Sequence, residues 1–191
     1  HNTAAKAAIE IALFDTICKK YGISLKDFLG APKNINSFET SITIGIMDKE
    51  SAVKKARSLV ANGAKILKVK IGTDPQGDIE RLEAIRQAVG DDIRIRIDAN
   101  QGYSVKQAIK VLRSIENLNI EYCEQPVHWK DISGMRAVRL NTEIPIMADE
   151  SVHSPKDAIN IIKNDAADMM NIKIMKAGGL RKAVEKGVLK S

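Results

Sequence analysis

The chain has 191 residues, of which 44% are hydrophobic and 28% charged, with a formal net charge of +6. This composition is typical of one sizeable soluble domain, and no apolar run approaches the roughly 18 residues of a membrane span. The basic excess does not indicate nucleic-acid binding, because aromatic residues are only 4% and the lysines are scattered along predicted helical faces. We therefore expect a cytoplasmic protein that binds neither nucleic acid nor membrane.

The first 36 residues predict a separate helical element. Residues 4–22 are alanine-rich with helical apolar spacing and stop at Gly22, and a short helical turn over 24–30 precedes Pro32. Cys18 and Cys123 have no CxxC spacing, so we expect reduced packing residues at both positions. The chain's three histidines are expected to be solvated, because they lie in terminal or loop positions: His1, His128 and His153.

From residue 37 onward, a short strand, a loop and an amphipathic stretch repeat. Strands are expected at 38–46, 65–72, 94–100, 120–126, 144–151 and 168–175, and the helices that follow them at 51–63, 78–90, 104–118, 133–141, 154–165 and 178–187. A (β/α)8-type barrel needs two more units and about 250 residues. The predicted α/β fold is therefore such a barrel with about six βα units present, C-terminally truncated. Periodicity alone also permits an open doubly wound sheet, although no GxGxxG follows the first strand.

Charged residues end these strands at intervals of 24–28 residues: Lys70, Asp98, Glu124, Asp149 and Lys173. In a parallel barrel the carboxyl ends of the strands gather on one face, so three carboxylates and two lysines are predicted to converge there. Side chains alternate along a strand, and Lys68 therefore shares the inward face with Lys70. A structural ion-pair network is the alternative reading, and it is the expected role of the deeper Arg94 and Arg96.

Asp98, Glu124 and Asp149 form a ligand set that suits a hard cation, Mg²⁺ first and Mn²⁺ next. The lack of an accompanying histidine argues against zinc. Such an ion can hold a substrate carboxylate and stabilise the enediolate that forms when the α-proton leaves. A lysine beside a second cation can serve as the base, which fits Lys70 next to Lys68. Lys173, from a strand across the barrel, would approach the opposite face of the same carbon.

Five segments, LKVKIG, DANQGY, EQP, ADES and NIKIMKAGG, resemble in order and spacing the muconate-lactonizing enzyme subgroup of the enolase superfamily. The resemblance implies acid/base roles for Lys70 and Lys173 and an accessory role for Lys68. It also implies a second-shell role for Asn100 and the magnesium ligands Asp98, Glu124 and Asp149. Lys176 falls beyond the sixth strand, next to Gly178 and Gly179, so we expect a loop or anion-contacting role for it. DANQG together with NIK-x-MK-x-GG looks most like the dipeptide epimerases of the L-Ala-D/L-Glu epimerase type.

This resemblance implies an isomerase that epimerises a dipeptide or another small carboxylate, and we expect it to form a homo-oligomer. A cycloisomerase, an o-succinylbenzoate synthase-type dehydratase and a catalytically incomplete fragment are the alternatives. Residues 1–36 resemble the segment that leads from the family's capping domain into the barrel, and 37–191 resemble barrel strands one to six. Most of the capping domain and strands seven and eight are absent, so we expect the 191-residue chain to be at most feebly active.

Overall fold

The computed structural model describes residues 2–32, 34 and 37–188, with side chains up to residue 185. The chain forms two compact units. The unit that we call the sheet unit contains Glu39–Ser151 and Asn160–Asn171. The second, which we call the helical unit, contains His1–Phe38, Val152–Ile159 and Ile172–Ser191. The predicted boundary after residue 36 falls outside the described residues, so the division into 1–36 and 37–191 stays a prediction.

The sheet unit is built on a six-stranded sheet whose strands are all parallel and follow one another in chain order. The strands are β1 (Ile42–Ile44), β2 (Ile66–Lys70), β3 (Arg94–Asp98), β4 (Ile120–Glu124), β5 (Ile146–Ala148) and β6 (Met169–Met170). Every expected strand is present, although the strands are shorter than the runs that predicted them. This sequential parallel order is the βα pattern of the predicted barrel and not of a doubly wound sheet.

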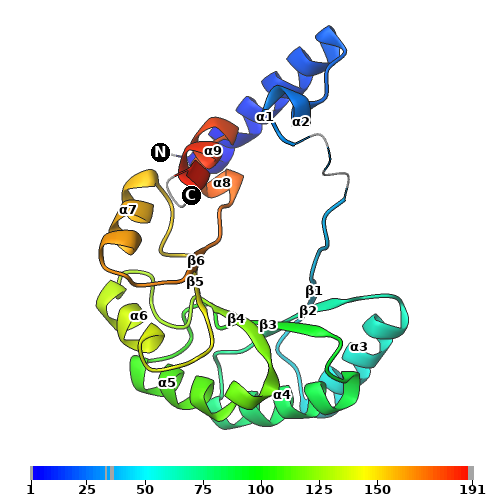
Figure 1. The fold of residues 1–191 in the computed structure, drawn as a ribbon, viewed down its shortest axis with the longest axis vertical. Helices are drawn as coiled ribbons and strands as arrows, with labels where there is room; N and C mark the ends of the chain where they lie inside the picture. Colours follow the sequence, from blue (N-terminus) through cyan, green and yellow to red (C-terminus); the bar gives the residue numbers. More distant parts are fainter. Residues whose placement is uncertain (1, 33, 35–36, 189–191) are drawn as a thin grey trace. The chain divides into compact units, whose positions relative to one another are not determined.

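Helices follow the strands and cover one face of the sheet, as Figure 1 shows for α3 to α6. Their bounds are α3 (Lys49–Ala61), α4 (Pro75–Val89), α5 (Val105–Ser114), the 3₁₀ turn η1 (Glu116–Leu118), α6 (Ile132–Arg139) and α7 (Pro155–Lys163). The side chains of Asp48, Asp74 and Asp131 accept backbone N–H groups at the starts of α3, α4 and α6. Ser104 and Gln107 form a capping box at α5. These local signals explain why each helix begins where it does.

The alternation predicted for β2 and β3 is confirmed. Leu67, Val69, Ile95 and Ile97 are completely buried toward the helices, whereas Lys68 and Lys70 lie on the other face with intermediate exposure. Leu82 and Ile85 of α4, Val111 and Leu112 of α5 and Met135 of α6 pack onto the apolar face with no exposed surface. Burial of each such side chain contributes about 1.5–3 kcal/mol, and the sheet is therefore held firmly by its helical side.

The pairing of β3 with β4 contains one irregularity that the alternation argument missed. Ile95 pairs with Ile120, but Ile97 pairs with Cys123, so β4 has one extra residue between the two pairs. A regular ladder continued from Ile95 would have placed Cys123 beside Asp98. The extra residue brings Glu124 level with Asp98 instead, in the way that bulges re-aim side chains next to functional sites.

The ion pairs expected of Arg94 and Arg96 are present. Arg94 contacts Glu39, and Arg96 donates from Nε to Glu121 Oε2 at 2.8 Å. The Arg96 guanidinium also lies 5.3 Å from the centroid of the Tyr122 ring. These contacts are made from the amino-terminal part of β3, away from its carboxyl end.

The sixth strand is much shorter than predicted. A strand over 168–175 is wrong beyond Met170, because β5 ends at Ala148 and offers no further ladder partner after Asn171 N–H binds the Ala148 carbonyl. The chain turns instead into a short helix, α8 (Ile174–Ala177), whose N-cap is Lys173. Lys173 therefore occupies the N-cap position of a helix after the strand and is not a strand residue.

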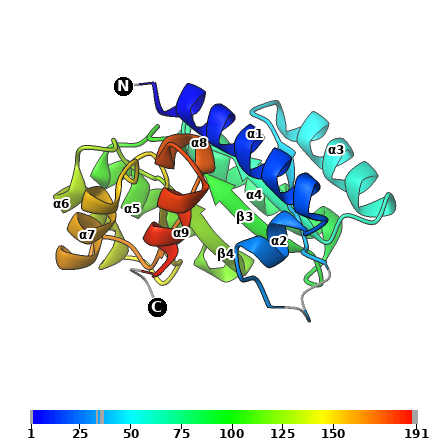
Figure 2. The ribbon, with the colours of Figure 1, turned by 90° about the horizontal axis from the view of Figure 1, so that it is seen from above.

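The helical unit contains α1 (Thr3–Tyr21), α2 (Leu25–Phe28), α8 and α9 (Leu180–Val188). Asn2 caps the start of α1. The helix ends at Gly22, as the sequence predicted, and Gly22 has the left-handed conformation. Figure 2 shows α8 and α9 beside α1, where Ala7, Ala177 and Leu180 are buried. No helix in the described ranges is long and apolar enough to cross a membrane.

Candidate active site

Three predicted ligands lie at the carboxyl edge of the sheet. Asp98 ends β3, Glu124 ends β4 and is its register partner, and Asp149 follows the last residue of β5. All three residues are buried, with exposures of 1%, 1% and 2%. Parallel pairing thus brings together acidic residues that are 25 and more positions apart in the chain.

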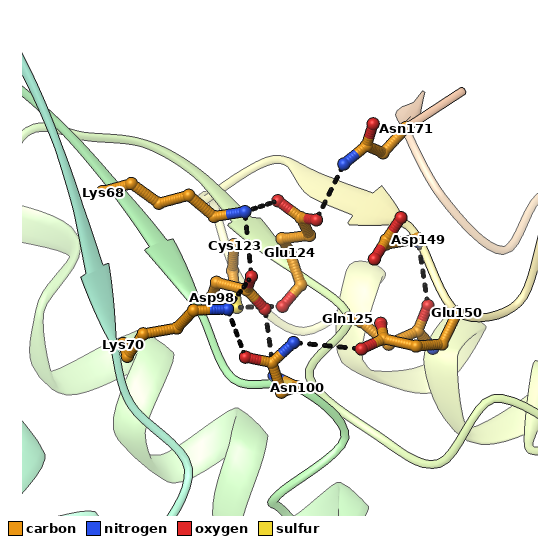
Figure 3. A network of polar contacts seen from close by, with 10 residues as sticks. All are labelled: Lys68, Lys70, Asp98, Asn100, Cys123, Glu124, Gln125, Asp149, Glu150 and Asn171. Atoms are coloured by element: carbon orange, nitrogen blue, oxygen red, sulfur yellow. Dashed lines mark hydrogen bonds and ion pairs between the residues drawn. The ribbon is translucent and has the colours of Figure 1, made fainter. Parts of the chain in front are cut away.

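Lys68 is the counter-charge of this edge. Its Nζ lies 2.5 Å from Glu124 Oε2 and 2.9 Å from Asp98 Oδ2, so one ammonium group bridges two buried carboxylates (Figure 3). Burial opposes the charge on Lys68, but the hydrogen bonds and negative charges of Asp98 and Glu124 outweigh burial and raise the pKa of the ammonium. Lys68 therefore stays charged and compensates the carboxylates.

Lys70 lies nearer the carboxyl end of the same strand. Its Nζ donates to Asp98 Oδ2 at 2.7 Å and to Asn100 Oδ1. Asn100 has a positive φ of 42° and donates its backbone N–H to Asp98 Oδ1 at 3.0 Å. Its Nδ2 donates to Glu150 Oε1 at 3.0 Å, which turns the amide oxygen toward Lys70. Asn100 is thus in direct contact with Lys70, and its expected second-shell role near a metal ion stays a prediction.

Two neighbours of the candidate site were missed by sequence reasoning, although both stand inside quoted motifs. Glu150 follows Asp149 in ADES and orders Asn100. Gln125 follows Glu124 in EQP and is completely buried. Asn171, just after β6, also donates from Nδ2 to Glu124 Oε1 at 2.9 Å.

A buried polar cluster supports the loop after β2. Asp78 accepts hydrogen bonds from Gly72 N–H at 2.9 Å and from the Tyr103 hydroxyl at 2.6 Å, and it pairs with Arg81. Arg81 in turn donates to the carbonyl of Lys70 at 3.0 Å. Burial, followed by the hydrogen bond and charge of Asp78, raises the pKa of Tyr103. The cluster fixes the backbone from which the Lys70 side chain extends.

The remaining expectations concern cysteine and histidine. Cys18 and Cys123 are free and buried, one in each compact unit, as predicted for packing residues. Burial, with smaller contributions from the charges of Asp98 and Glu124, raises the pKa of the Cys123 thiol. His128 and His153 are exposed, as predicted, and His1 lies outside the described residues.

The side chains at the carboxyl edge of the sheet show whether this edge could bind a metal ion. Over residues 2–32, 34 and 37–188, no group of three or more His, Cys, Asp or Glu side chains is arranged to hold an ion, and Asp98 and Glu124 share Lys68 instead. The chemistry of the set still fits a hard divalent cation, because its donors are buried carboxylate oxygens at adjacent strand ends. Glu150 Oε2 is also buried and lacks a hydrogen-bond partner among the described atoms. The residues present therefore fit Mg²⁺.

One compact unit brings together Lys68, Lys70, Asn100 and the three carboxylates. Lys173 and Lys176 belong to the helical unit, where Lys173 occupies the N-cap position of α8. The loop position expected for Lys176 is wrong, because Lys176 lies in the last turn of α8. The roles of all these residues stay predictions.

The family model and the most similar curated relatives point to the same family. Residues 51–186 match the family described as "Enolase C-terminal domain-like". The L-Ala-D/L-Glu epimerase of Clostridium acetobutylicum is 45% identical over 186 residues, which are 96% of this chain and 51% of that protein. The N-succinyl-L-Arg/Lys racemase of Bacillus cereus is 40% identical over 182 residues, 95% of this chain and 49% of that protein.

Solved structures agree with these relatives. A dipeptide epimerase from Cytophaga hutchinsonii, complexed with Mg and the dipeptide D-Ala-L-Val, matches with a TM-score of 0.95 and 38% identity over 98% of this chain and 51% of that chain. The six-stranded sheet with its helices is thus similar to enolase-superfamily (β/α)8 barrels. The chain belongs to the enolase superfamily and carries its C-terminal domain-like fold. It spans about half the length of the curated relatives it matches.

Proposed function

We propose that this protein removes and returns the proton α to a carboxylate, in a magnesium-dependent epimerisation of a dipeptide. The observation that carries the proposal is the cluster at the carboxyl edge of the sheet, where Lys68 and Lys70 contact the buried Asp98 and Glu124. A lysine within hydrogen-bond reach of a cation-binding carboxylate set is the arrangement that proton abstraction beside a carboxylate needs.

Asp98, Glu124 and Asp149 are the proposed ligands of Mg²⁺, and Mn²⁺ offers the same coordination chemistry. When bound, the ion supplies electrophilic stabilisation of the negative charge that develops on the substrate carboxylate. Lys68 keeps the buried carboxylates compensated. Asn100, fixed by Glu150, holds its amide oxygen against Lys70 and so limits the positions of that amine.

Lys70 in its neutral form takes the α-proton, and the C–H electron pair moves into the substrate carboxylate to give an enediolate. Lys173 in its ammonium form then returns a proton to the opposite face of the carbon, which inverts the centre. For the other isomer the two lysines exchange roles. Two bases are required because one group on one face can exchange the proton but cannot invert the configuration.

The relatives narrow the substrate class. The name of the C. acetobutylicum enzyme gives a dipeptide, and that of the B. cereus enzyme gives an N-succinyl amino acid. Both substrates are amino acids acylated on nitrogen, so an N-acylated amino acid with a free carboxylate, most simply a dipeptide, is the proposed substrate. Cytoplasmic location and a homo-oligomer stay predictions.

The test is isotope exchange in a full-length protein that contains this chain. Lys70→Ala and Lys173→Ala should each abolish net epimerisation. Each variant should still exchange the α-proton of one isomer with deuterated solvent, and the two variants should prefer opposite isomers, as measured by mass spectrometry. Lys106→Ala, on the exposed surface of α5, serves as the control and should epimerise normally. Exchange of the same isomer by both variants would favour a one-base cycloisomerase or dehydratase instead.

A further inference from the structure

Gln125 occupies an unusual place at the end of β4. It directly follows Glu124, its side chain is completely buried, and its backbone has a positive φ of 38°. A non-glycine residue persists in this strained conformation only when its surroundings hold it there. The surroundings of Gln125 are therefore informative about its role.

The side-chain amide of Gln125 is fully used. Its Oε1 accepts the backbone N–H groups of Asp149, at 2.9 Å, and Ser151, at 3.1 Å. Its Nε2 donates to Ser151 Oγ at 2.8 Å and to the Val127 carbonyl at 3.0 Å. The two bonds to Oε1 come from the loop that follows β5, and one of them comes from Asp149, the third proposed carboxylate ligand.

The backbone of Gln125 also forms hydrogen bonds on both sides of β4, with β5 and with the loop after β3. Its N–H donates to the Met147 carbonyl of β5 at 2.8 Å, and its carbonyl accepts Gln101 N–H, in the loop after β3, at 2.8 Å. One residue thus joins the three strand exits that carry Asp98, Glu124 and Asp149. Figure 3 shows the bond that joins Gln125 to Asp149, with Gln125 beside Glu150.

We propose that Gln125 is a positioning residue whose side-chain amide fixes the Asp149–Ser151 backbone against the end of β4, and so sets the spacing of the carboxylates for a divalent cation. We call the two hydrogen bonds from the Asp149 and Ser151 N–H groups to Gln125 Oε1 the clamp. The effect of the clamp on cation binding rests on the function proposed above, whereas the clamp itself does not. Residues that hold metal ligands in place change metal affinity by roughly 10–100-fold when they are replaced.

The test uses two variants that fail differently. Gln125→Met keeps the volume and removes the amide. Gln125→Gly relieves the strained φ and also removes the amide, so a role confined to backbone conformation predicts normal behaviour for Gly. Ser151→Ala removes one partner of Nε2 and leaves both Oε1 bonds in place. Gln87→Met, on the exposed face of α4, is the matched control.

Hydrogen exchange measured by mass spectrometry reads the clamp directly. The amides of Asp149 and Ser151 should lose protection in Gln125→Met and Gln125→Gly, while the amide of residue 125, which binds a backbone carbonyl, should keep it. Ser151→Ala should retain the Asp149 amide protection. Unchanged protection at Asp149 and Ser151 in both Gln125 variants overturns the proposal.

Calorimetric titration with MgCl₂ reads the consequence. Both Gln125 variants should bind Mg²⁺ at least about tenfold more weakly than the wild type and the Gln87→Met control. Affinity within about twofold of wild type in either variant overturns the positioning role. If the wild-type chain binds no Mg²⁺, the proposed cation site fails, and the hydrogen-exchange result alone decides whether Gln125 is the clamp.

Discussion

At the scale of single residues, the two lysines of β2 have different surroundings despite their identical chemistry. The Lys68 side chain is 17% exposed and bridges two carboxylates, whereas the Lys70 side chain is 29% exposed and contacts one carboxylate and one amide. Lys68 is consequently committed to charge compensation. Lys70 has an amide partner that holds it without a second negative charge, which suits a group that must give and take protons.

The carboxylates should each be required for cation binding. Asp98→Asn, Glu124→Gln and Asp149→Asn each remove a charge that a hard cation needs, and each variant should lower Mg²⁺ affinity by at least about tenfold in calorimetry. The control is Asp92→Asn, at an exposed residue just before the amino-terminal end of β3. It should leave the affinity for Mg²⁺ unchanged. Equal affinity in wild type and all three carboxylate variants would sink the metal assignment.

Tyr103 should make the protein sensitive to alkali. Burial and Asp78 raise the pKa of Tyr103 in the folded protein, so above about pH 10 the unfolded chain loses this proton while the folded chain keeps it. The free energy of unfolding should therefore fall as pH rises above about 10, by up to about 1.4 kcal/mol per pH unit for this one proton.

Urea unfolding between about pH 9 and about pH 11 checks this dependence. Tyr103→Phe should be less stable than wild type at neutral pH, because the hydroxyl bonds to Asp78 and Gly72 are lost, and its stability should decline less steeply in alkali. Tyr21→Phe, at a residue that is 69% exposed, is the comparison. Parallel slopes for Tyr103→Phe and wild type would contradict the assignment.

At the scale of elements, the loops after β2 and β3 are packed backbone against backbone. A Cβ on Gly72 would lie 2.3 Å from the Ala99 carbonyl oxygen, and a Cβ on Gly102 would lie 2.1 Å from the Gly72 oxygen. These loops follow Lys70 and Asp98 directly, so their close approach helps to fix both functional side chains.

Gly72→Ala should therefore be strongly destabilising. Gly63 has a comparable positive φ, 89° against 108° for Gly72, but a Cβ there meets nothing within 4 Å. Gly63→Ala should cost about 1–2 kcal/mol for the left-handed backbone alone, and Gly72→Ala should exceed that loss by at least about 2 kcal/mol because of the clash. Chemical denaturation of both variants measures the difference, and similar losses would show that the loops separate easily.

Element order was predictable from sequence because each βα unit carries local signals, namely β-branched alternation in the strand and a polar cap before the helix. Strand lengths were less predictable, since a strand extends only as far as its neighbour offers partners. Residues 171–175 have strand-like composition, yet β5 ends at Ala148 and the chain turns into α8. The extra residue in β4 is likewise a property of a pair of strands, and alternation within one strand cannot reveal it.

The candidate site was also predictable only in part. Its charged residues could be found from the sequence because burying an ionised group costs free energy unless the group is paired or binds a metal. Gln125 and Glu150 were not singled out, because their importance lies in which backbone and side-chain atoms they reach, and those partners are up to 50 positions away.

At the scale of the whole molecule, the described sheet has two strands with a single neighbour each, β1 and β6. The 191-residue chain spans about half of its relatives. We expect this polypeptide alone to epimerise dipeptides at least about a hundredfold more slowly than the C. acetobutylicum relative, because a misplacement near 1 Å can cost that much in rate. A turnover assay on material of verified mass tests this, and comparable rates would contradict it.

The placement of the two thiols makes the stability of each compact unit separately measurable. Cys18 is 4% exposed in the helical unit, and Cys123 is fully buried in the sheet unit. A thiol reagent can reach either sulfur only after local opening, so the labelling rate of each cysteine reports the opening equilibrium of its own unit. Labelling followed by peptide mapping therefore determines, in one sample, whether the two units open together or in sequence.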